Sequence, residues 1–212
     1  MARIFLIHAL RESVAPARAA MERGWPDAQV CNLLDDSLSA DLARLGHLDD
    51  AMIDRFVRLG RYARDEGAQG ILFTCSAFGK AIEAVKADLP IPVLKPNESA
   101  FRAALRHGKR IGLLVTFVGS LAPLSAELRA AAGKGLQLEA HLVEGALQAL
   151  ESGDGAAHDR AIATVATALP PVDAIVLGQF SMARAAANVA HAHVYTTPDA
   201  AVAELKTLVG LR

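Results

Sequence analysis

The chain has 212 residues, of which 52% are hydrophobic and 21% charged, and its formal net charge is −1. This is the composition of an ordinary globular protein with room for one domain or two small ones. The near-neutral charge argues against a nucleic-acid surface, which needs clustered Lys and Arg. No apolar run approaches the roughly 18 residues of a membrane span, so we expect no membrane partner.

The first residues, MARIFLIHAL, contain too short an apolar run for a signal peptide. We therefore predict that they form a first strand and that the protein is cytoplasmic. The two cysteines, Cys31 and Cys75, cannot form a disulfide framework and are predicted to stay reduced.

Strand-like and helical segments alternate along the chain. The strand-like runs are residues 3–7, 29–34, 70–74, 91–94, 110–116, 136–143, 173–178 and 193–196. Helical stretches include residues 48–66, 79–87, 122–132 and 156–168, with DAAVAELKTLVG as a closing helix. Most strand-like runs are continuously apolar, which indicates sheets covered on both faces. The alternation predicts an α/β fold of mainly parallel strands flanked by helices, with right-handed crossovers.

The strand-like runs of the first half resemble those of the second half in the same order. The matched pairs are Arg3 with Arg110, Gln29 with Gln137, Ile71 with Ile175, and Val93 with Val194. Their nearly constant separation indicates an internal duplication. We predict two pseudo-symmetric lobes, one formed by residues 1–97 plus 198–212 and the other by residues 98–197.

A cysteine ends the third strand-like run, in the stretch GILFTCSAFGKAIEAV, and a helical pattern follows at once. Free N–H groups at a helix N-terminus favour a thiolate, can hold a carboxylate, and can be capped by Ser76. Sites in open α/β sheets lie beyond the carboxyl ends of strands, so the repeat predicts Cys75 and Gln179 on opposite walls of one cleft. Cys75 is then a base at carbon or a nucleophile. The alternative is simple packing, which is our interpretation of Cys31.

The duplicated α/β layout and the motif FTCSAFG resemble the aspartate/glutamate/hydantoin racemase superfamily, which also contains arylmalonate decarboxylases and maleate isomerases. The resemblance covers nearly the whole chain. It implies a homodimeric enzyme that acts on a small carboxylate through cysteine, without a metal, nucleotide or pyridoxal cofactor. Cys75 matches the first catalytic cysteine. The second turn reads Leu-Gly-Gln, so Gln179 stands where the second cysteine is expected, and an amide is neither an acid nor a base.

Several alternatives stay open for the missing second thiol. In the first alternative, the acid on the opposite face of the substrate is another residue near a strand end, and the candidates are His8, Glu98 and Asp199. Alternatively, Cys75 works alone on one face, as in an arylmalonate-type decarboxylase, or as a nucleophile, as in a maleate isomerase. We slightly favour the one-sided chemistry. A further alternative is a binding protein that keeps the shape of the site without turnover.

Seven polar residues near strand ends are predicted to contact the substrate, and for Thr116 and Ser120 this is implied by the family resemblance, since the corresponding loop of the family binds a substrate carboxylate. They are His8, Thr74, Ser76, Thr116, Ser120, Gln179 and Ser181. For the hydroxyl residues the competing interpretation is an ordinary turn or helix cap, and a histidine after an apolar strand is more often structural. His191 and His193 lack a third ligand at suitable spacing, so we predict no metal site. Gly-rich phosphate loops are missing as well.

Overall fold

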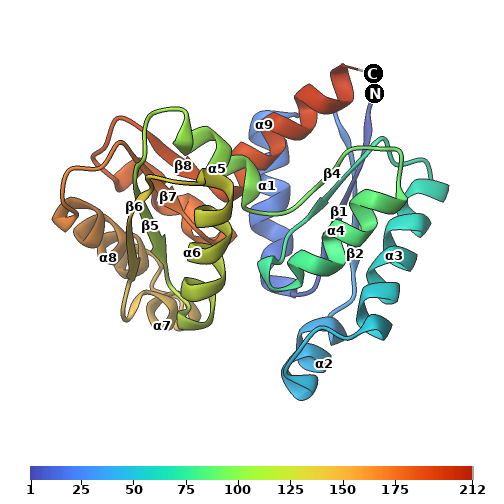
Figure 1. Ribbon diagram of the computed structural model, residues 1–212, viewed down its shortest axis with the longest axis horizontal. Helices are drawn as coiled ribbons and strands as arrows, with labels where there is room; N and C mark the ends of the chain where they lie inside the picture. The colour runs from blue at the N-terminus through green and yellow to red at the C-terminus, as the bar shows by residue number, and fades with distance from the viewer. Residues whose placement is uncertain (212) are drawn as a thin grey trace. The chain divides into compact units, whose positions relative to one another are not determined.

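The computed structural model describes residues 1–211, and the chain divides into two compact units. Unit 1 comprises Met1–Pro96 and the chain from Ala201 onward, and unit 2 comprises Asn97–Ala200. Each unit holds one four-stranded sheet in which every pairing is parallel. Helices flank both sheets (Figure 1), which confirms the predicted α/β class.

Unit 1 contains strands β1 to β4 in the order β2-β1-β3-β4. The strands are β1 (Arg3–His8), β2 (Gln29–Leu34), β3 (Gly70–Phe73) and β4 (Val93–Leu94). The helices are α1 (Val14–Gly24), α2 (Ser37–Leu45), α3 (Asp50–Asp65), α4 (Gly79–Asp88) and most of α9 (Thr197–Gly210). Two short 3-10 helices, η1 (Arg11–Ser13) and η2 (Ser76–Phe78), follow the ends of β1 and β3.

The two faces of the first sheet carry different helices, because successive side chains of a strand point to opposite faces. Phe5 and Phe73 join the core cluster formed with α3 and α4, which lie side by side in Figure 1. On the other face Gly70 lies under Leu205 and Val209 of α9. The strands are therefore buried from both sides, as their continuous apolar sequence predicts.

Unit 2 contains strands β5 to β8 in the order β6-β5-β7-β8. The strands are β5 (Arg110–Val115), β6 (Gln137–Leu142), β7 (Ala174–Leu177) and β8 (Val194–Thr196). The helices are α5 (Glu98–Leu105), α6 (Val118–Ala132), α7 (Ala146–Glu151) and α8 (Gly155–Ala168), and the 3-10 helix η3 (Phe180–Asn188) follows β7.

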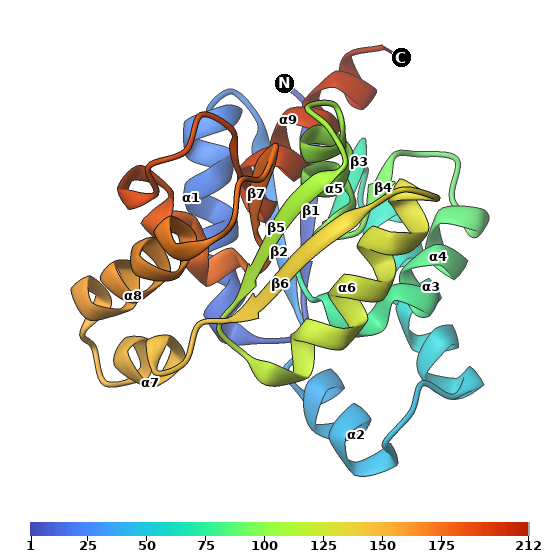
Figure 2. The same cartoon turned by 60° about the vertical axis from the view of Figure 1, so that its left-hand side comes forward.

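The second sheet also has a core on each face. Leu113 of β5 packs in a cluster with residues of α5 and α6, such as Leu128. Its neighbour Leu114 packs on the opposite face with residues of α8 and η3, such as Ile162 and Met182. Figure 2 shows α6 and α8 flanking β5 and β6.

The two sheets repeat each other in strand order and in ladder register. Ile4 of β1 pairs with Gly70 of β3, and Ile111 of β5 pairs with Ala174 of β7. These four residues are related by the separations that the sequence repeats predict, which confirms the internal duplication. The repeat makes Cys75 and Gln179 equivalent, since each stands two residues beyond the end of a central strand.

Several element bounds differ from those predicted. β3 ends at Phe73, because Thr74 already belongs to the turn that leads into η2. α6 begins at Val118, earlier than predicted, and contains Pro123.

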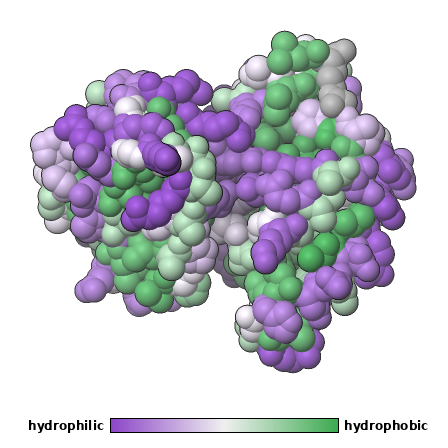
Figure 3. Space-filling model, in the orientation of Figure 1, coloured by the Kyte–Doolittle hydropathy of each residue, from purple (hydrophilic) through white to green (hydrophobic). Residues whose placement is uncertain are grey.

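No helix within residues 1–211 is long and apolar enough to cross a lipid bilayer. Figure 3 shows mostly hydrophilic residues over α3 and α4, interrupted by small hydrophobic patches.

Candidate active site

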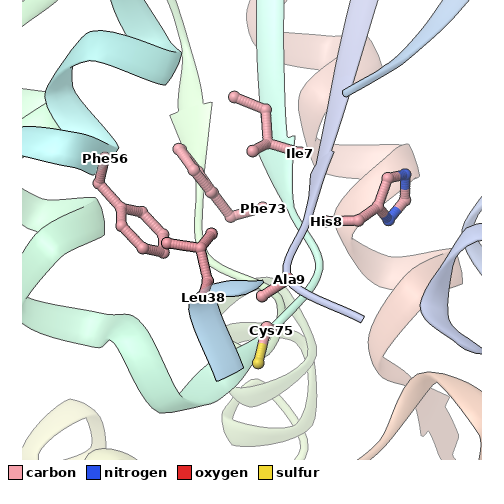
Figure 4. Close-up of a pocket in the computed structure, with 7 residues that line it drawn as sticks. All are labelled: Ile7, His8, Ala9, Leu38, Phe56, Phe73 and Cys75. Atoms are coloured by element: carbon pink, nitrogen blue, oxygen red, sulfur yellow. The ribbon is translucent and has the colours of Figure 1, made fainter. Parts of the chain in front are cut away.

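Cys75 occupies the turn between β3 and η2 in unit 1. Its backbone is extended, its side chain is partly exposed, and it is the N-cap residue of η2. A small, mostly apolar pocket beside it is lined by Ile7, His8, Ala9, Leu38, Phe56, Phe73 and Cys75 itself. In Figure 4 the sulfur points away from the ring of His8 and away from the aromatic side chains. The thiol is thus held at the rim of the unit's core.

Three phenylalanines anchor the two ends of the cysteine turn. Phe73 precedes the turn, Phe78 follows it, and both rings contact Phe56 of α3, with ring centroids 5.4 and 4.8 Å away. All three are almost fully buried. Because both ends of the turn are packed on one ring, the position of Cys75 depends on the core of unit 1.

Replacing Phe56 with alanine is expected to lower the free energy of unfolding of unit 1 by about 3–5 kcal/mol, since the change leaves a cavity under both ends of the turn. The sole tryptophan, Trp25, lies in unit 1 and is nearly buried, so its fluorescence during urea unfolding measures this unit. Phe56→Leu is the control and should cost clearly less. Equal losses in the two variants would contradict the anchoring role of the ring.

Burial dominates the electrostatics of Cys75. It raises the pKa of the thiol, and a hydrogen bond from the backbone N–H of Ala77 opposes this only in part. The predicted stabilisation of a thiolate by a helix N-terminus is therefore wrong for the resting protein. In addition, η2 separates Cys75 from α4, which begins only at Gly79. The prediction that Ser76 caps the helix is also wrong, because neither η2 nor α4 has a side-chain cap.

His8 lies fully buried at the end of β1. Its Nε2 is 3.1 Å from Oδ1 of Asn32 on β2, so this nitrogen carries the ring proton and donates it. Its Nδ1 is 2.9 Å from Oγ1 of Thr74 and 3.1 Å from Oγ of Ser13. Both ring nitrogens are therefore engaged with protein groups, which leaves none for the substrate contact predicted from the sequence.

The stability of unit 1 is expected to fall as the pH drops below about 6.5, partly because of His8. Desolvation by burial lowers the pKa of His8, against a smaller opposing effect of the Asn32 hydrogen bond. The unfolded chain therefore binds a proton near its ordinary pKa while the folded ring resists it. Stability is retained above the unfolded pKa and lost as the pH falls toward the lower folded value.

Urea unfolding followed by Trp25 fluorescence at about pH 7.5 and pH 5.5 measures this loss. His8→Asn removes the titrating ring, so its stability should change less between the two pH values than that of the wild type. An equal change in both proteins would contradict the assignment to His8.

In unit 2 the equivalent turn carries Gln179, whose side-chain oxygen is held by Thr116. The backbone N–H and the hydroxyl of Thr116 both donate to Oε1 of Gln179, at 2.6 and 2.9 Å. Within residues 1–211 the Nε2 of Gln179 donates to no protein acceptor. The amide is thus fixed through its oxygen, and its two N–H groups are free for another acceptor.

The other predicted hydroxyl residues fall into two groups. Thr74 is buried and its hydroxyl is engaged with His8 and Ser13. Ser76, Ser120 and Ser181 are partly exposed, and their hydroxyls have no protein partner among residues 1–211. These three remain available for a ligand, whereas Thr74 does not.

The two carboxylates considered as second acids already have partners. Glu98 is nearly buried and lies 3.6 Å from Arg102 on the same helix. Asp199 accepts a hydrogen bond from the Thr196 hydroxyl at the start of α9. Among residues 1–211 no group of three or more His, Cys, Asp or Glu side chains could hold a metal ion. The His191 ring forms hydrogen bonds with the carbonyl of Val172 and the backbone N–H of His193, as expected for a structural residue.

Sequence reasoning did not identify Ser13 and Asn32, which complete the surroundings of His8. Asn32 interrupts the apolar run QVCNLL, and that is the one signal that the sequence carries for it. A polar residue inside such a run indicates a partner on a neighbouring strand, but it does not say which.

A parallel α/β unit that occurs twice, with a cysteine beyond the central strand of the first copy, defines a duplicated α/β enzyme scaffold. The family model for Asp/Glu/Hydantoin racemase matches residues 15–205, and the chain therefore belongs to this family of racemases, which are isomerases. No curated protein sequence matches the chain significantly.

Solved structures share the fold at low sequence identity. The allantoin racemase from Klebsiella pneumoniae is 20% identical, with a TM-score of 0.76 over 100% of this chain and 89% of that one. The glutamate racemase RacE1 from Bacillus anthracis is 16% identical, with a TM-score of 0.69 over 99% and 82% of the two chains. An unliganded arylmalonate decarboxylase is 16% identical, with a TM-score of 0.68 over 99% and 94%.

Proposed function

We propose that this protein is a cofactor-independent enzyme that exchanges a proton at the α-carbon of a small carboxylate, with Cys75 as the acid/base. The substrate class is an amino acid, a hydantoin or a substituted malonate. The observation that carries the proposal is the place of Cys75: a partly exposed thiol just beyond the carboxyl end of a central parallel strand, where open α/β sheets bind their ligands.

The chemistry needs a group that removes a proton from carbon and returns it. The thiolate of Cys75 takes the α-proton, the C–H electron pair moves into the adjacent carbonyl group as an enediolate or enolate, and the thiol returns a proton to the same carbon after its S–H has exchanged with water. Formation of the other enantiomer needs a proton delivered to the opposite face. The costly species is the enediolate, which hydrogen-bond donors stabilise. The uncommitted hydroxyl of Ser76, the residue after Cys75, supports this role, and the sequence repeat is the basis for including Ser120 and Ser181 in the proposal.

Gln179 enters the proposal as a substrate-binding residue. Thr116 holds its oxygen, so the remaining Nε2 protons suit a carboxylate oxygen of the substrate. The amide cannot replace a second thiol in proton transfer. Thr116 is therefore proposed to act through Gln179.

A second candidate, one-sided decarboxylation of a substituted malonate, is favoured by the raised pKa of Cys75. Loss of CO₂ leaves an enediolate, and the thiol S–H then delivers its proton to the α-carbon, after which water reprotonates the thiolate. This reaction starts from the protonated thiol and needs no second acid. The engagement of His8, Glu98 and Asp199 with protein groups fits it as well.

Proton NMR in D₂O with a panel of amino acids, hydantoins and substituted malonates tests both candidates. Deuterium at the α-carbon with both enantiomers present supports racemisation, and loss of a carboxyl group with deuterium on one face supports decarboxylation. No exchange and no decarboxylation across the panel would contradict the proposal. A homodimer is also proposed, by family resemblance, and sedimentation equilibrium measures it.

A further inference from the structure

His8 connects the carboxyl ends of three neighbouring strands. It stands on β1, its Nε2 donates to Asn32 of β2, and its Nδ1 meets the hydroxyl of Thr74, directly after β3. Ser13 of η1 completes the set, with its oxygen 2.9 Å from that of Thr74. One buried ring thus makes hydrogen bonds to the segments around Thr74, the residue that precedes Cys75.

The directions of the hydrogen bonds follow from the proton on Nε2. Nδ1 must then accept, and the Ser13 hydroxyl donates to the Leu10 carbonyl at 2.7 Å. The Thr74 hydroxyl is also 3.4 Å from the carbonyl of Ile7, but Nδ1 is closer at 2.9 Å, so we assign the hydroxyl proton to Nδ1. The backbone N–H of Thr74 donates to Ile7 at 3.1 Å, so Thr74 is held at two points. The residue after it is Cys75.

The fold itself does not need this network, because unit 2 builds the equivalent turn without it. At the repeat positions of His8, Thr74 and Asn32 the second unit has Val115, Gly178 and Ala140. Only Ser13 keeps its residue type, as Ser120. Burying an imidazole costs desolvation that a valine avoids. The hydrogen-bond network of the buried His8 occurs in the unit that carries Cys75. Apolar or small residues replace it in the unit that carries Gln179.

We propose that His8 is a positioning residue for Cys75: through the Thr74 hydroxyl it holds the turn in which the thiol meets the Ala77 N–H. The catalytic consequence rests on the proposed function, but the positioning itself does not. Loss of the ring should leave the unit folded, as in its repeat, and leave the thiol in a looser turn.

The decisive variant is His8→Val, which installs the residue of unit 2. His8→Asn is the rescue variant, since its shorter amide can still accept from Thr74 at the place of Nδ1. Both are made in a Cys31→Ser background, so that iodoacetamide reports Cys75 alone. We expect His8→Val to speed alkylation of the half-buried thiol at least about fivefold, and His8→Asn to return most of the way to the parent rate.

With a substrate from the NMR panel, His8→Val should lower kcat about tenfold and change KM less than about twofold, because the ring touches no substrate. Met52→Ala controls for general loosening, since it removes a buried side chain of α3 outside the network. A parent-like alkylation rate in folded His8→Val, or an equal increase in Met52→Ala, would overturn the proposal. If no substrate turns over, the proposed function fails, while the alkylation rates still decide the role of His8.

Discussion

Replacing Cys75 with serine is expected to reduce α-proton exchange, or decarboxylation, by about 10²- to 10⁴-fold, the usual contribution of a positioned acid or base. The alcohol keeps the size and the hydrogen bonding of the thiol but is a far weaker acid, so it can neither form a base at carbon nor protonate the enediolate efficiently. The rate of deuterium incorporation at the α-carbon, measured by NMR with a substrate of the wild-type enzyme, gives the change directly.

The matched control for this variant is Cys31→Ser. Cys31 is the other cysteine, lies partly buried on the edge strand β2, and packs against the core cluster of unit 1. It should retain turnover, with a modest loss of stability. Equal activity losses in the two variants would show that thiol chemistry at Cys75 is not the cause, and an active Cys75→Ser protein would remove Cys75 from the mechanism.

Much of the fold could be predicted because buried parallel strands have an unmistakable sequence pattern. Runs such as GILF and AIVL are apolar without interruption, and their resemblance, order and spacing indicate the repeat. The ladder register in the two sheets follows the same spacing, since a register shift would turn every buried side chain to the wrong face.

The site was less predictable, because side-chain direction and burial depend on contacts between distant segments. The sequence places His8 at a strand end but does not tell that Asn32 and Thr74 enclose it. The pKa of Cys75 was predicted to fall from its closeness to a helix, whereas burial raises it. Desolvation raises the pKa of the thiol, and a hydrogen bond from one N–H group lowers it. Which effect is larger depends on packing, not on position in the chain.

The hydrogen bonds of Gln179 show the same limit. Its place in the repeat, equivalent to that of Cys75, is visible in the sequence, but its attachment to Thr116 is not, since the two residues come from different strand ends. The hydrogen bonds from Thr116 change how glutamine at the position of the second cysteine is interpreted. Thr116 fixes the amide oxygen of Gln179, so only the N–H groups of the amide are left without a partner among residues 1–211.

Replacing Gln179 with cysteine is expected to raise the rate at which the opposite enantiomer forms by about 10²-fold, because it supplies a second acid/base at the position that the repeat makes equivalent to Cys75. Chiral chromatography of the product of a single-enantiomer or prochiral substrate measures this rate. Gln179→Ser is the matched control: it removes the amide in the same way and leaves the same Thr116 donors without their acceptor, but its hydroxyl is too weak an acid to serve. If both variants slow turnover and neither forms the second enantiomer, Gln179 acts by binding alone, and the equivalence of the two turns does not extend to their chemistry.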